Sequence, residues 1–297
     1  MRGAPISKYL EDYKKWLLWR GLRERTISGY IKRIVRFISD IGDLKADKIK
    51  KKHIVEWTIK LRQRGSNDYV ITCLWAIRSF LKYLNEEAGI RTYNFEGFFI
   101  PKRTKKEYVE FLDNDEIRTI LYRIDTSNIH GLRLRAYLEL LLNTGMRPSE
   151  ALSLSRKDVE NWPDEIEIIG KGGKKRKVYL NKRAKYWLRK YLNARIDDHP
   201  ALFVTHCRPN WWSLRRAEEA FHNLVQEIGF NKKITLHTLR HTFGTNLLRH
   251  GCPIDYIAKL LGHANPETTR IYYLSILQED VKMAYNCLLY TSPSPRD

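Results

Sequence analysis

The sequence predicts a mainly α-helical protein with a small β-sheet, divided into two domains. Apolar residues recur at helical spacing through the first hundred residues, whereas a stretch near residues 165–180 alternates in the manner of paired strands. A basic, proline-containing stretch interrupts the pattern between them. A length of 297 residues fits two domains of ordinary size, and 43% hydrophobic residues suffice for each to bury a core.

The first domain, expected over residues 1–96, is predicted to be a helical bundle. From Ile27, apolar side chains at offsets of 3, 4, 7, 11 and 14 residues lie on one helix face. Short loops between such helices favour a bundle. The four expected helices cover Ser7–Trp19, the segment from Thr26 as N-cap to Gly42, His53–Arg64, and the segment after Ser66-Asn67-Asp68 that ends near Gly89.

Positive charge is the first indication of function. The chain carries 54 Lys and Arg against 34 Asp and Glu, a net charge of +20. Residues 1–100 hold 21 basic and 11 acidic side chains and the remainder 33 and 23, so both halves are basic, which favours a polyanion held by two domains over a basic tail. A solvated exterior is the alternative to the DNA-facing surface that we expect on the first domain, at Lys14, Lys15, Lys32, Arg33, Arg36, Lys50, Lys51 and Lys52.

A basic linker is expected over residues 97–112, where Pro101 precedes the run Lys102–Lys106. Two basic domains joined in this way suit a clamp around a duplex. The second domain is then expected over residues 113–286. Its predicted elements are a helix with Asp113 as N-cap, a helix at Ala136–Asn143 ended by Gly145, a hairpin of Ile166–Ile168 with Val178–Leu180, helices to Asn193, a strand at Leu202–Val204, and helices from Ser213 onward.

Several protein classes are disfavoured by composition. No apolar run approaches the ~20 residues of a membrane span, and the N-terminus lacks the apolar core of a signal peptide. The four cysteines lie far apart with no CxxC pair, which disfavours zinc fingers and thioredoxin-like chemistry and fits a reducing compartment. We therefore expect a cytoplasmic protein with no membrane partner.

Residues 287–297, CLLYTSPSPRD, resemble the translation of a sequencing-library adapter. We interpret them as a non-native tail and expect the natural sequence to depart from this one near Asn286. A native genomic reading frame encoding the same eleven residues would refute this interpretation.

Four segments carry side chains suited to a phosphodiester: TGMRPSEALSL around Arg147, GKGGKKR around Lys171, HTLRHTF from His237, and LGHANPETTRIYY from Leu261. Arg147 stands at a helix junction, where a guanidinium is held firmly for bidentate phosphate contact. His237 and Arg240, three residues apart, share one helix face. Tyr272 follows His263 by nine residues, close enough for a turn to bring both to one site.

These segments resemble the boxes of the tyrosine recombinase (phage integrase) family, most closely its Xer-like branch. The resemblance extends to about residue 286 and is weakly diagnostic in the N-terminal part, which is similar to the family's SAM-like core-binding domain. Pro148 is a mild departure from the first-arginine box. The catalytic residues that the resemblance implies are Arg147, Lys171, His237, Arg240, His263 and Tyr272.

The resemblance implies a site-specific recombinase that cleaves and rejoins DNA through a 3′-phosphotyrosine and a Holliday junction. Tyr272 would be the nucleophile and Lys171 the acid that protonates the leaving 5′ oxygen, while the two arginines stabilise the transition state. His237 would act as a base, and His263 would hydrogen-bond the phosphate. Bond energy is conserved in the phosphotyrosine, so neither ATP, metal nor another cofactor is expected.

The partners implied are double-stranded DNA and a homotetramer on two DNA sites, with room for an accessory protein. Relatives exchange a C-terminal segment between protomers, which here would start with Leu274–Asn286 and continue past it. Because the tail replaces part of that segment, we expect the chain as written to assemble tetramers poorly.

Alternative interpretations remain open at the level of the sequence. Tyr273 adjoins the proposed nucleophile, and His237 with His241 has the i, i+4 spacing of a zinc site but no third ligand. The sequence GKGGKK lacks the P-loop register. The basic residues 174–177 are expected to contact DNA or remain solvated. Competing functions are a catalytically silent DNA-binding protein of the same fold, supported by helix–turn–helix character at Leu247–Leu261, and a type IB topoisomerase.

Overall fold

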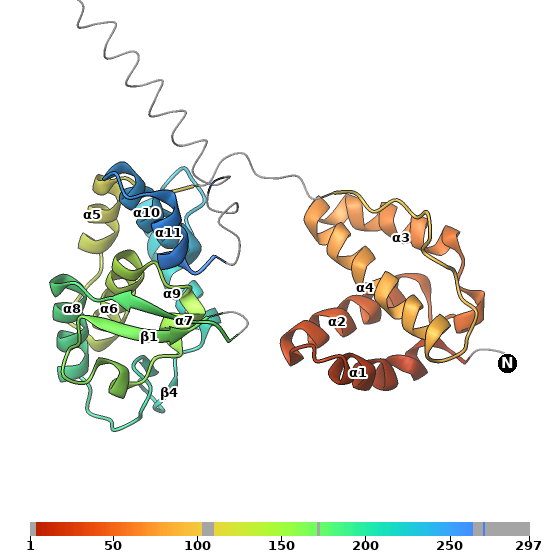
Figure 1. Ribbon diagram of the computed structural model, residues 1–297, viewed down its shortest axis with the longest axis horizontal. Helices are drawn as coiled ribbons and strands as arrows, with labels where there is room; N and C mark the ends of the chain where they lie inside the picture. The colour runs from red at the N-terminus through yellow and green to blue at the C-terminus, as the bar shows by residue number, and fades with distance from the viewer. Residues whose placement is uncertain (1–3, 103–109, 171–172, 264–269, 271–297) are drawn as a thin grey trace, which may run out of the picture. The chain divides into compact units, whose positions relative to one another are not determined.

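The computed structural model describes residues 4–102, 110–170, 173–263 and 270, and its elements are labelled in Figure 1. The chain divides into two compact units, Met1–Lys105 and Lys106–Asp297. Several predicted features lie outside the described residues, namely Lys171, Tyr272, Tyr273, the segment 274–286 and the tail 287–297.

The first unit is a helical bundle, as predicted. Its helices pack around α4, which contacts both α2 and α3. Buried aromatic side chains fill the core, with the Phe37 and Trp57 rings 4.9 Å apart in an edge-to-face arrangement. The elements are a 3-10 turn at Ile6–Tyr9, α1 (Leu10–Trp19), α2 (Glu24–Ile41), a 3-10 turn at Ala46–Lys48, α3 (Lys51–Arg64) and α4 (Asn67–Glu86).

The ends of these helices follow local capping chemistry. The Ser66 hydroxyl accepts a hydrogen bond from the backbone N–H of Tyr69 and so begins α4. Gly42 ends α2 with a φ of 89°, which confirms its predicted role. Thr26 as the first cap was wrong, because α2 begins at Glu24 with Arg23 as its N-cap.

The second unit is built around α6, which contacts α7, α8, α9, α10 and β2 (Figure 1). Its tyrosine Tyr137 is fully buried and packs edge-to-face on both Phe203 and Trp212. Helices dominate the unit. They are α5 (Asn114–Tyr122), α6 (Ile129–Thr144), α7 (Pro148–Leu152), a 3-10 turn at Arg156–Val159, α8 (Lys182–Asn193), α9 (Leu214–Ile228), α10 (Leu236–Arg249) and α11 (Ile254–Leu261).

Two short antiparallel hairpins complete the unit. The predicted hairpin consists of β1 (Glu165–Ile169) and β2 (Lys175–Tyr179), whose register pairs Ile166 with Val178. The predicted strand at Leu202–Val204 begins later, as β3 (Val204–Thr205), and pairs with β4 (Asn210–Trp211), which the sequence did not predict. The mainly α-helical fold with little sheet is confirmed. Within the described residues, no helix combines the length and apolar character required to cross a bilayer.

Candidate active site

Arg147 occupies the junction between two helices, as its sequence context predicts. Its backbone caps α7, and its N–H donates to Glu150 Oε2 at 2.8 Å. Its guanidinium donates from Nη1 to Glu150 Oε1 at 2.8 Å and from Nη2 to the carbonyl of Gly262 at 3.3 Å. The side chain is 27% exposed, so it is held by both contacts yet remains open to a ligand.

Arg240 reaches the same place from α10. Its Nη1 donates to the Gly145 carbonyl at 2.6 Å, and its Nη2 donates to the Leu261 carbonyl. The two arginines therefore bind successive carbonyls, those of residues 261 and 262, where α11 ends. Segments separated by about a hundred residues in sequence converge at this point, and the guanidinium of Arg240 is almost entirely buried.

Gly145 makes this convergence sterically feasible. It ends α6 in the left-handed conformation, with a φ of 60°. A Cβ atom there would lie 2.3 Å from a Phe243 ring carbon and 3.0 Å from Leu261. No larger residue fits, so the helices that carry the two arginines approach each other only because this position lacks a side chain.

Two histidines, His237 and His263, lie near these two positively charged arginines. Burial, followed by the charges of Arg240 and Arg147, lowers the pKa of His263 to about 4. The exposed His237 is partly desolvated, and this effect together with Arg240 and Arg147 also lowers its pKa. Both imidazoles are therefore neutral near pH 7, the state in which a histidine can accept a proton.

His241, one turn after His237, belongs to the same surroundings. Burial and the charges of Arg240 and His237 lower its pKa to about 4. Among the residues that the structure describes, no three His, Cys, Asp or Glu side chains gather in an arrangement for a metal ion.

Glu150 and Arg176 also belong to this site, although neither is among the six predicted catalytic residues. The carboxylate of Glu150 accepts from Arg147 on one side and from Arg176 on the other, at 3.1 Å from Nη1 and 2.6 Å from Nη2. Burial opposes ionisation of Glu150, but the hydrogen bonds from Arg176 and Arg147 outweigh it and lower the pKa to about 2. The carboxylate therefore stays charged and joins the two guanidiniums.

The expectation that Arg176 contacts DNA or solvent was wrong. Its side chain is only 10% exposed, and its Nε also donates to the Leu260 carbonyl at 3.2 Å. Strand alternation was the available signal, because Arg176 pairs with the buried Ile168 and so lies on the inward face of the hairpin. Lys175 and Lys177 fit the solvated alternative, since they are exposed and pair with Glu167 and Glu165.

The structure thus brings together four of the six predicted residues: Arg147, His237, Arg240 and His263. Lys171 and Tyr272 lie outside the described residues. The chain enters the Lys171 segment from β1 and leaves it towards β2, whose Arg176 is bound to Glu150. Two guanidiniums beside two neutral imidazoles can bind the non-bridging oxygens of a phosphate and accept a proton nearby.

The sequence is similar to known proteins over most of its length. The profile described as the Phage integrase family matches residues 110–278. The tyrosine recombinase XerD of Oceanobacillus iheyensis is 32% identical over 283 residues, which cover 89% of this chain and 92% of that protein.

Two solved recombinase structures resemble this chain in fold. The XerA recombinase is 27% identical, with a TM-score of 0.51 over 94% of this chain and 98% of that one. A lambda integrase tetramer bound to a Holliday junction shares the fold, with a TM-score of 0.72 at 19% identity over 89% of this chain and 79% of that one. The resemblance inferred from the four boxes is confirmed: the chain belongs to the phage integrase family, among its Xer-like tyrosine recombinases.

Proposed function

We propose that this chain is a site-specific DNA recombinase, which cleaves and rejoins duplex DNA through a covalent phosphotyrosine. The observation that carries the proposal is the convergence of Arg147 and Arg240 on the carbonyls of residues 261 and 262. A phosphoryl-transfer transition state places extra negative charge on the non-bridging oxygens, and two fixed guanidiniums stabilise that charge. The relatives are named tyrosine recombinases, which supports this reaction class.

In the proposed reaction, the Tyr272 hydroxyl attacks the scissile phosphorus and the bond to the 5′ oxygen breaks. A 3′-phosphotyrosine and a free 5′-hydroxyl result. His237 receives the phenolic proton, and Lys171 donates a proton to the leaving oxygen. The lowered pKa of His237 supports its role, because the imidazole is available as a base at neutral pH. Attack by a 5′-hydroxyl of the second duplex then reverses the bond changes and gives a Holliday junction.

His263 has a different proposed role. Its pKa is held near 4 by burial and the neighbouring arginines, so it carries no charge in the free protein. A neutral imidazole donates one hydrogen bond to a phosphate oxygen without requiring a counterion. We assign it to binding the scissile phosphate beside Arg147 and Arg240.

Assembly on DNA is a consequence of strand exchange, because four strands must be cut in pairs. We propose a homotetramer on two duplexes, in the manner of the lambda integrase tetramer on its Holliday junction. Since the substrate is duplex DNA, the reaction is assigned to the cytoplasm. No described residue singles out an accessory protein.

A nicked suicide duplex tests the proposal. The nick lies a few nucleotides from the cleavage point, so that the 5′-hydroxyl fragment diffuses away and the covalent complex accumulates. Because the target sequence is unidentified, a randomised duplex library serves as the substrate. A protein–DNA adduct that resists denaturant and EDTA is the expected result, and sequencing the trapped DNA gives the site preference.

The silent alternative gives a different outcome in this assay, and a topoisomerase is distinguished by separate relaxation and strand-joining assays. A catalytically silent member of the fold would shift the DNA in a gel but form no adduct. A type IB topoisomerase would form the adduct and relax supercoils but would not join strands from two duplexes. Arg147→Ala is the matched negative control, since it removes one guanidinium and is expected to lower cleavage by roughly two to three orders of magnitude.

A further inference from the structure

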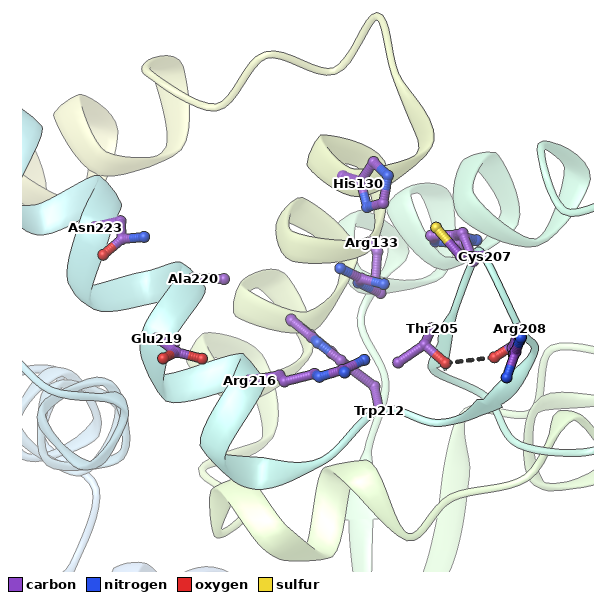
Figure 2. A pocket seen from close by; sticks show the side chains of 11 residues that line it. His130, Arg133, Thr205, Cys207, Arg208, Trp212, Arg216, Glu219, Ala220 and Asn223 are labelled. Carbon is purple, nitrogen blue, oxygen red and sulfur yellow. Dashed lines mark hydrogen bonds between the residues drawn. The ribbon is translucent and has the colours of Figure 1, made fainter.

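A second concentration of positive charge lies in the same unit. A pocket of about 610 Å³ opens between the N-terminal part of α6, the β3–β4 loop and α9 (Figure 2). Its walls include Arg133, Arg208 and Arg216. His130, His206 and Cys207 also line it, and Glu219 is its acidic member. With three arginines against one glutamate, the pocket is positively charged.

Arg133 is the buried floor of this pocket. It is 9% exposed, and its Nη1 donates to the Val204 carbonyl at 2.8 Å. Its guanidinium carbon lies 4.2 Å from the centre of a Trp212 ring, which fixes the plane of the group. Within the described part of the chain, its buried Nε has no hydrogen-bond partner. A buried charged donor left in this state is costly.

The other cations of the pocket increase that cost. Arg216 extends from α9 into the space that Arg133 borders (Figure 2), and its charge contributes, after burial, to a lowered pKa of Arg133. Burial, then Arg133 and His130, lowers the pKa of His206 to about 4. The buried Nε2 of His206 also lacks a hydrogen-bond partner among the described residues. The like charges of Arg133 and Arg216 thus border one space, where an anion would relieve the repulsion.

This pocket is separate from the candidate active site. Arg133 lies in the first part of α6, whereas Gly145 and Arg147 follow its C-terminal end. At 1.5 Å per residue, about 16 Å of helix lies between Arg133 and Thr144. The residues of the pocket share no side chain with the set around Arg147 and Arg240.

We propose that this pocket is a second phosphate-binding site, in which Arg133, Arg208 and Arg216 hold one phosphate group at a distance from the reacting one. Tetrahedral oxyanions suit it, because guanidinium groups from three segments of the chain can each bind a different oxygen. The phosphate belongs either to a DNA backbone or to a free ion or small phosphorylated compound. The inference goes beyond the proposed recombinase function and does not depend on it.

The rate at which Cys207 is alkylated reports whether this pocket is occupied. It is an exposed free thiol in the lining, whereas the free Cys252 lies between α10 and α11 outside the lining. The full chain is alkylated with N-ethylmaleimide in a phosphate-free and sulfate-free buffer, and modification of each cysteine is followed by mass spectrometry. Three additions are compared: sodium chloride, inorganic phosphate at equal ionic strength, and duplex DNA.

A bound phosphate should slow alkylation of Cys207 by about threefold or more relative to chloride, because it shields the exposed thiol from the reagent. Cys252 should react at the same rate in phosphate and in chloride. Arg216→Gln should abolish the protection, and Arg215→Gln is the matched control, since Arg215 is an exposed neighbour on α9 outside the lining. Both replaced side chains are exposed, and thermal unfolding verifies that both variants fold.

Comparing inorganic phosphate with duplex DNA distinguishes the two sources of the bound phosphate. Protection by inorganic phosphate that Arg216→Gln abolishes supports the site and identifies a free anion as sufficient. Protection by duplex DNA alone, again abolished by Arg216→Gln but not by Arg215→Gln, supports the site and identifies a backbone phosphate. Equal alkylation in all additions, or protection that survives in Arg216→Gln, would overturn the proposal.

Discussion

At the residue scale, Glu150 explains how two arginines from different segments keep their positions. Its two carboxylate oxygens are shared between the first-arginine loop and the hairpin strand β2. Such a charge-assisted network is stronger than its separate parts, and removing one member leaves the others poorly paired. Glu150 is therefore a positioning residue, since it acts on the substrate only through Arg147.

Glu150→Gln tests this role. The amide keeps the shape but loses the charge, so we expect DNA cleavage to fall by roughly 10–100-fold while DNA affinity changes little. Single-turnover adduct formation on the suicide duplex measures the first quantity and a gel shift the second. Arg176→Gln should have a similar effect, and the double variant should be no worse than either single one, because both belong to one network. Fully additive losses would contradict the network.

Tyr272→Phe tests the nucleophile. The phenol oxygen is removed while the ring is kept, so adduct formation should disappear and DNA binding should remain within a few-fold. Tyr273→Phe is the matched control and should retain the adduct. The opposite pattern would assign the nucleophile to Tyr273.

Lys171 is tested through the leaving group. Lys171→Ala should lower cleavage of ordinary DNA, but a 5′-phosphorothiolate substrate should restore it, because a thiolate leaves without a proton. Absence of rescue would remove Lys171 as the acid.

The histidines make stability depend on pH. His263 and His241 have folded-state pKa values of about 4, below the ordinary value of 6.5, so the unfolded chain binds more protons in this interval. Their contribution is fully present above pH ~6.5 and is lost as pH falls towards 4. Thermal unfolding should therefore show a midpoint that drops by several degrees over this range. His263→Gln should reduce the dependence without abolishing it, because His241 and His206 keep their lowered pKa values of about 4.

At the element scale, the junction of α6 and α7 depends on Gly145. Gly145→Ala should destabilise the protein by about 3 kcal/mol or more, because an added methyl meets Phe243 in addition to the strain of a positive φ. Gly229 is the matched control. It ends α9 with a φ of 78° and nothing lies within 4 Å of an added Cβ, so Gly229→Ala should cost only about 1 kcal/mol. Urea unfolding compares the two, and equal losses would contradict the steric argument.

Elements with local signals could be predicted from the sequence. The cap Asp113 and the helix-ending Gly42 and Gly145 stand where the pattern placed them, because capping needs only neighbouring residues. The helix α4 begins at Asn67, earlier than the expected start after Asp68, and α9 begins at Leu214, next to the expected Ser213. The inward position of Arg176 followed from strand alternation, but its ion pair with Glu150 could not be derived from local sequence. The strand β4 could not be derived in this way either, because it depends on pairing with β3.

The candidate site likewise has features that sequence spacing predicts and features that only tertiary packing shows. Arg147, His237, Arg240 and His263 were recognised because each box has a fixed internal spacing. Their common location, at the carbonyls that end α11, results from tertiary packing against α6 and α10 and not from spacing. Glu150 lies three residues after Arg147 in the sequence, but its ion pair with Arg176 of the hairpin is seen only in the folded structure.

At the scale of the whole molecule, charge is spread over both units. The net charge of +20 divides equally between residues 1–100 and the rest, with +10 in each. If the exterior of the first unit faces DNA, its lysines release counterions on binding, and the affinity depends steeply on salt. The triple variant Lys50→Gln, Lys51→Gln, Lys52→Gln should then reduce the slope of log affinity against log salt by up to about 2.7, at roughly 0.9 per phosphate contact.

Fluorescence anisotropy with a labelled duplex measures this slope at several salt concentrations. All three lysines are exposed at the start of α3, so the fold should be unaffected. An unchanged slope would show that these charges are merely solvated and that the first unit contacts DNA through another face.

The carboxylate shared by Arg147 and Arg176 also has an evolutionary consequence. A homologue that lacks the carboxylate at position 150 would keep a buried guanidinium at position 176 without its counterion. A homologue that lacks the guanidinium would likewise keep a buried carboxylate with one partner fewer. The two positions should therefore covary across an alignment of relatives, although 26 residues separate them.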